Sequence, residues 1–160
     1  MTESPDAAAT VPADRQITHE VLGTFVREVT VFGNGEELDS PHFSATCGMD
    51  GRELEMLLET EDPDEARSML PRLMHVIDWF GDFRDHAIEA IVRTFSTEPP
   101  TDADYADAQE DLAADTIVVE GDGQVILHFS DLCGEHFMDG YWPAVRFDVE
   151  DHVADVTVEA

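Results

Sequence analysis

The chain has 160 residues, of which 42% are hydrophobic, so it is long and apolar enough to bury the core of one domain. Its 37 acidic residues far outnumber its eight basic ones, all of them arginine, and the formal net charge at pH 7 is −29. A surface this negative repels phosphate, which argues against nucleic-acid binding, and no apolar run is long enough to span a membrane.

The first 16 residues, MTESPDAAATVPADRQ, are acidic and have the composition of a disordered tail. We expect this tail to precede a single domain over residues 17–160. The tail contains no apolar segment of the kind that signal peptides carry. The two cysteines, Cys47 and Cys133, fit a reducing compartment, so a cytoplasmic location is expected, although one disulfide between them is left open.

Three segments in the first third of the chain have the composition of β-strands. Residues 21–32 are rich in β-branched and aromatic side chains, with a bend expected at Gly23. Residues 42–48 and 52–59 alternate apolar and polar side chains and flank the turn signal Asp50-Gly51. The pattern predicts three antiparallel strands.

A helix is predicted to begin directly after these strands. Asp62 is suited to cap it, Pro63 to occupy its first position, and Glu65 to complete a capping box. We expect Pro71 to kink or divide this helix, and Gly81 to end it.

Two further helices and four strands follow. The helices are predicted over residues 82–96 and 101–112, and the strands over 116–120, 124–130, 144–150 and 154–159. Trp79 and Phe80, between the first two helices, are expected in the core. The order of elements predicts an α+β fold. It has a mostly antiparallel sheet of about seven strands, with two to three helices inserted between an N-terminal and a C-terminal strand group and covering one face.

The densest set of reactive side chains lies in residues 128–139. Cys133 and His136 are spaced so that one loop could bring a thiolate and an imidazole to one metal ion, with His128 as a third ligand and zinc as the metal. One alternative is a structural loop in which His136 bonds to the backbone. Another is a nucleophile–base pair of Cys133 and His136, which so short a spacing in a loop disfavours.

An aromatic group lies beside these residues. Phe137, Tyr141 and Trp142 occur in a short segment bounded by glycine and aspartate, as in many binding surfaces. With His136 they are the candidate residues for contact with a partner. The alternative is that these side chains plug one end of the sheet.

Residues 115–129 and 134–149, preceded by helices within 62–95, carry a resemblance to a known group of proteins. A strand hairpin, a Gly-x-His-like loop and a strand ending in acidic turns occur in the same order in a group of uncharacterised bacterial intracellular domains. Some members of that group are similar to immunity proteins paired with toxins, which implies a small accessory protein that binds a partner. Residues 137–143 are an insertion relative to that pattern, so no site residue is carried over.

Three functional hypotheses follow. The first is a non-enzymatic, acidic protein-binding domain, such as an immunity-type inhibitor of a basic partner, because no catalytic motif is found and an acidic surface attracts a basic one. The second is a metal-dependent enzyme that uses the loop within residues 128–139. The third is a salt-adapted domain whose acidity has no binding role.

Overall fold

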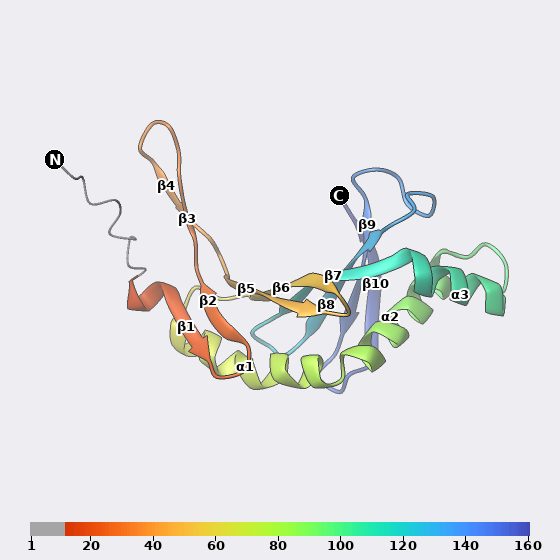
Figure 1. Cartoon of the computed structure of the whole chain (residues 1–160), viewed down its shortest axis with the longest axis horizontal. Helices are drawn as coiled ribbons and strands as arrows, with labels where there is room; N and C mark the ends of the chain where they lie inside the picture. Colours follow the sequence, from red (N-terminus) through yellow and green to blue (C-terminus); the bar gives the residue numbers. More distant parts are fainter. Residues whose placement is uncertain (1–11) are drawn as a thin grey trace.

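The computed structural model describes residues 12–160, in which an eight-stranded sheet is covered on one face by two helices (Figure 1). The order of strands in this sheet is β1-β2-β5-β6-β7-β8-β9-β10. Its strands are β1 (Gln16–His19), β2 (Gly23–Val26), β5 (Phe43–Met49), β6 (Arg52–Leu58), β7 (Leu112–Val119), β8 (Val125–Asp131), β9 (Trp142–Phe147) and β10 (Val153–Glu159). The helices are α1 (Pro63–Asp78), α2 (Phe80–Phe95), α3 (Asp102–Asp111) and the short 3-10 helix η1 (Ala13–Arg15).

The predicted α+β class, the mostly antiparallel sheet and the position of the helices between two strand groups are confirmed. The two groups join in one sheet through β6 and β7, which are parallel and pair from Glu55 with Thr116 to Leu58 with Val119. Parallel neighbours need a long crossover, and the three helices provide it. All other pairs of neighbouring strands in the described part of the sheet are antiparallel.

The N-terminal strand prediction is wrong in one respect. Residues 21–32 do not form a single strand, because the chain leaves the main sheet after β2. It then forms a separate two-stranded arm, β3 (Val29–Val31) with β4 (Glu37–Asp39), that projects from the body (Figure 1). The predicted tail of residues 1–16 lies mainly outside the described residues. Within its described part, η1 forms and Gln16 already pairs with Val26.

The start of α1 follows the sequence signals in part. The Asp62 carboxylate accepts a hydrogen bond from the Asp64 amide at 2.9 Å, and Pro63 is the first helical residue. Glu65 does not complete a capping box, because its carboxylate accepts a hydrogen bond from the Thr60 hydroxyl at 2.9 Å instead. That bond ties the first turn of α1 to the segment leaving β6.

Pro71 does not divide α1, and Gly81 does not end a helix. α1 continues through Pro71, since buried residues on both sides, including Leu70 and Leu73, hold it on the sheet and offset the lost backbone hydrogen bond. The break comes at Trp79, and Gly81 lies inside α2.

One hydrophobic core lies between the sheet and these helices. Leu73, Val76 and Ile88 of the helices pack in it with Met56, Ile117 and Leu127 of the central strands. Because side chains alternate along a strand, the residues between these strand positions face the opposite, uncovered side of the sheet. No helix within residues 12–160 is long and apolar enough to cross a bilayer.

Arg72 connects α1 to two turns of the C-terminal strands. Its guanidinium donates to the Gly123 carbonyl at 2.8 Å, to the Asp148 carbonyl at 2.9 Å and to the Asp151 carboxylate at 2.5 Å. His75 bonds the second carboxylate oxygen of Asp151 at 2.6 Å. Burial alone would raise the pKa of Asp151, but the hydrogen bonds from His75 and Arg72 outweigh it and hold that pKa below its ordinary value.

Candidate functional site

The predicted contact residues, in and beside the loop between β8 and β9, divide between two hollows. His136 and Phe137 line the first hollow, beside α2 and α3, whereas Trp142 lines the second, on the uncovered face of the sheet. Tyr141 lines neither of them and is 48% exposed. The aromatic residues therefore do not form one surface.

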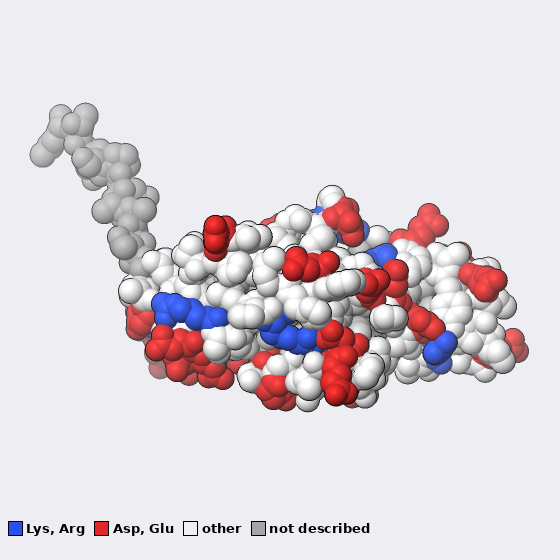
Figure 2. All heavy atoms as spheres, turned by 90° about the horizontal axis from the view of Figure 1, so that it is seen from below, with Lys and Arg blue, Asp and Glu red and all other residues white. Residues whose placement is uncertain are grey.

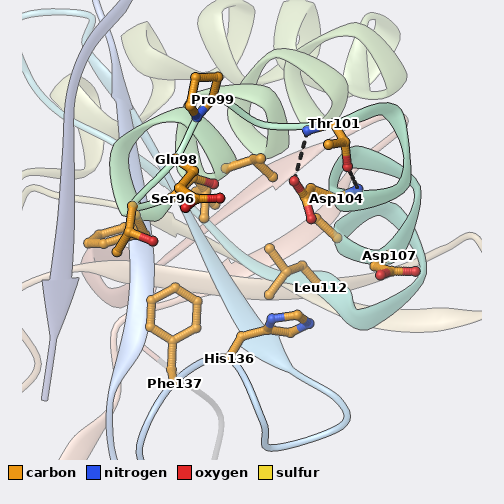
Figure 3. Close-up of a pocket in the computed structure, with 14 residues that line it drawn as sticks. Ser96, Glu98, Pro99, Thr101, Asp104, Asp107, Leu112, His136 and Phe137 are labelled. Carbon is orange, nitrogen blue, oxygen red and sulfur yellow. Dashed lines mark hydrogen bonds between the residues drawn. The ribbon is translucent and has the colours of Figure 1, made fainter.

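The first hollow has a volume of about 540 Å³ and lies between the end of α2, α3 and the loop (Figure 3). His136 and Phe137 reach into it from the loop side, and Phe137 packs edge-to-face on Phe95 with ring centroids 5.4 Å apart. The opposite wall includes Thr101 and Asp104, which form a reciprocal capping box at the start of α3.

Asp131 holds the loop in its shape. One of its carboxylate oxygens accepts the amides of His136 and Phe137 at 2.8 and 3.0 Å, and the other accepts a hydrogen bond from Cys133 Sγ at 3.2 Å. Burial would raise the pKa of Asp131, but these hydrogen bonds hold it below its ordinary value. The Leu132 amide bonds the carbonyl of Asp111 at 2.8 Å, which fastens the loop to the end of α3.

These contacts bring three metal-binding side chains together. Single ligand atoms of Asp111, Cys133 and His136 lie within 4.8 Å of one another. The sequence placed Cys133 and His136 in one candidate site but missed Asp111, which comes from another element. His128, the third ligand expected from the sequence, lines the second hollow instead.

His136 donates a hydrogen bond from Nε2 to the Asp111 carboxylate at 2.8 Å, and this bond raises its pKa above the ordinary value. We expect a histidine NMR titration to show a raised pKa for His136 in the native chain and a lower one in Asp111→Asn. Glu20→Gln, which removes an exposed carboxylate near the other end of the described chain, is the control and should leave the titration unchanged.

The sign of the pH effect follows from the raised pKa. The pair contributes to stability below the unfolded pKa of histidine, about 6.5, and this contribution is lost as the pH rises through the folded value. A His136 titration that Asp111→Asn leaves unchanged would contradict the assignment of this pair.

The second hollow lies on the uncovered face of the sheet and has a volume of about 700 Å³. Its lining comes from five neighbouring strands: Thr46, Glu53, Glu55, Leu57, Asp115, Thr116, His128, Ser130 and Trp142. Trp142 Nε1 donates to His128 Nδ1 at 3.0 Å, which fits a neutral imidazole with its proton on Nε2. A Glu159 carboxylate oxygen lies 3.4 Å from the same nitrogen.

Asp115 is a polar residue of this hollow that the sequence did not single out. It lies where β7 changes register against β8, between Ala114 and Thr116, so its carboxylate reaches the uncovered face. There it accepts hydrogen bonds from the hydroxyls of Thr116 and Ser130. The interruption of an apolar run by Asp115 was the available signal, but the predicted strand began one residue later.

The carboxylates of this hollow are not neutralised by arginine. Within residues 12–160, Glu53, Glu55 and Asp115 form no ion pair, and Arg146 on a neighbouring strand is paired with Glu120. Carboxylates and an indole in one hollow are a combination that recognises ammonium and guanidinium groups.

Comparison of the chain with protein-family models, with curated proteins and with solved structures finds no match. Any functional conclusion therefore depends on the chemistry of the two hollows and of the loop between β8 and β9.

Proposed function

We propose that the chain is a non-enzymatic, acidic protein-binding domain whose uncovered sheet face receives basic side chains of a partner. An immunity-type inhibitor of a basic protein would act in this way. The observation that carries the proposal is the second hollow, which is lined by Trp142 and by three carboxylates, those of Glu53, Glu55 and Asp115, that have no arginine partner within the described chain. A lysine or arginine entering this hollow would meet several carboxylates and an aromatic ring.

Net charge alone does not select this face. Figure 2 shows that Asp and Glu are also scattered over the side of the molecule that carries the helices, with a few arginines among them. Such a distributed charge attracts any basic protein at long range and mainly raises the association rate. Specificity needs close contacts, and the hollow on the uncovered face supplies them from five adjacent strands.

The competing hypothesis is that the acidity is an adaptation to salt without a binding role. Under that hypothesis, removing carboxylates of equal exposure would have the same effect on partner capture wherever they lie. Under the proposal, those of the hollow are required, so a charge-matched comparison separates the two.

The test uses the whole chain, immobilised, to capture partners from a lysate of the source cell at several salt concentrations. We expect Glu53→Gln with Glu55→Gln to reduce recovery of the captured basic protein about 10-fold or more, because two desolvated contacts are lost. The matched control is Glu20→Gln with Asp78→Asn, which changes the net charge equally at two exposed positions. It should lower recovery only slightly.

Three outcomes would contradict the proposal. They are the absence of any captured protein at low and moderate salt, a captured protein without basic character, and equal losses in the two double variants. The last result would favour the salt-adaptation hypothesis.

A further inference from the structure

We infer that Asp111, Cys133 and His136, supported by Asp131, form a binding site for a divalent transition metal of the zinc class. The site lies where the end of α3 meets the loop that follows β8. It is independent of the uncovered sheet face, and it differs from the set expected from the sequence because Asp111 stands in place of His128.

The distances are close to those that a tetrahedral ion requires. Zinc bonds to sulfur, nitrogen and oxygen ligands at about 2.0–2.3 Å, so ligand atoms around it lie about 3.3–3.8 Å apart. In the structure, the atoms of Asp111, Cys133 and His136 lie within 4.8 Å of one another, and His136 Nε2 is 2.8 Å from Asp111 Oδ2. An Asp131 oxygen lies 3.2 Å from Cys133 Sγ. Three protein ligands leave the fourth position of a tetrahedral ion to water.

The backbone around these ligands is already fixed. The other oxygen of Asp131 holds the amides of His136 and Phe137, and the Leu132 amide is bonded to Asp111. Phe137 is packed against Phe95. Binding would therefore order few additional groups. The ordering of flexible groups is the main cost of assembling a metal site from a loop.

The donor set indicates the class of metal. A thiolate and an imidazole favour zinc and cobalt over magnesium and calcium, which take oxygen ligands. Cys133 is exposed and His136 is partly so, so an ion can reach the site without any opening of the fold. A bound ion would join α3 to the loop and fix the wall that His136 and Phe137 form in the first hollow.

The test is a titration of the metal-free chain, carrying no histidine tag, with Co²⁺ in the presence of excess Mg²⁺. We expect one Co²⁺ per chain, a near-ultraviolet absorption from thiolate-to-cobalt charge transfer, and displacement of Co²⁺ by Zn²⁺. Cys133→Ser should abolish the absorption, and His136→Ala and Asp111→Asn should weaken binding. Asp131→Asn, which disturbs the support of the loop that carries Cys133 and His136, should weaken binding about 10–100-fold.

Cys47→Ser is the matched control, because Cys47 is the other cysteine and lies half-buried on β5. It should retain both the absorption and the stoichiometry. Circular dichroism of each metal-free variant checks that the fold is intact. If Cys133→Ser is unfolded, the loss of Co²⁺ binding in Asp111→Asn tests the site in its place. The inference is overturned if no charge-transfer absorption forms, if it survives in Cys133→Ser, or if Mg²⁺ displaces Co²⁺. No partner protein is involved, so the result does not depend on the proposed function.

Discussion

Replacing Arg72 with alanine should lower the free energy of unfolding by about 2–4 kcal/mol. The Arg72 side chain is 17% exposed and donates to three acceptors that come from two different turns of the C-terminal strands. Its loss would leave the carbonyls of Gly123 and Asp148 and the carboxylate of Asp151 without this donor. Urea unfolding at one fixed salt concentration measures the effect, because salt screening changes the stability of so acidic a chain.

Two variants define the cause of that loss. Arg72→Lys should recover only a small part of the stability, since an ammonium group cannot reach three acceptors in the geometry of the guanidinium fork. Arg67→Ala removes an exposed arginine of the same helix whose only ion pair within the described residues is with Asp64, and it should cost at most about 0.5 kcal/mol. Equal losses in Arg67→Ala and Arg72→Ala would show that charge balance, and not the connection to the turns, determines the stability.

The elements that the sequence predicted best are those with local signals. β5 and β6 follow the alternation around Asp50-Gly51, and their ladder runs from Phe43 with Leu58 to Met49 with Arg52. The start of α1 follows from Asp62 and Pro63. In each case the deciding interactions lie within a few residues, so the pattern of side chains contains them.

The parts that the sequence did not predict depend on contacts between distant segments. The parallel pairing of β6 with β7 joins residues about sixty positions apart, and no local pattern distinguishes it from two separate sheets. Pro71 shows the same principle, because burial of α1 on the sheet outweighs the local cost of a proline inside a helix.

The residues of the candidate sites also differ in whether local signals or contacts between distant segments bring them together. Cys133 and His136 are three residues apart, and the sequence placed them in one site. Asp111 reaches them only because the end of α3 is bonded to the loop through the amide of Leu132. His128 and Trp142 are directed to the uncovered face by the alternation of β8 and β9, which becomes visible only when the strands have been placed in the sheet.

The second large loss of stability is expected from a substitution at the junction of α1 and α2. Phe80→Ala should lower the free energy of unfolding by about 3–5 kcal/mol, because this side chain is 6% exposed and belongs to the core cluster. Trp79→Ala should cost less than about 1 kcal/mol, because the indole of Trp79 is 57% exposed. The sequence predicted both residues in the core, and for Trp79 this is wrong. The helical path changes at Trp79 and turns its side chain outward, while Phe80 begins α2 on the buried side.

Circular dichroism is the suitable measurement for this pair, since Trp79 is one of only two tryptophans and its removal changes the fluorescence signal itself. Phe80→Leu is the control for Phe80→Ala. It keeps most of the buried volume and should recover a large part of the lost stability, which distinguishes a cavity from a change in helix propensity. If Trp79→Ala destabilises the protein as much as Phe80→Ala does, Trp79 must be buried in solution. Trp79 is exposed among the described residues, so that result would contradict its assignment to the surface.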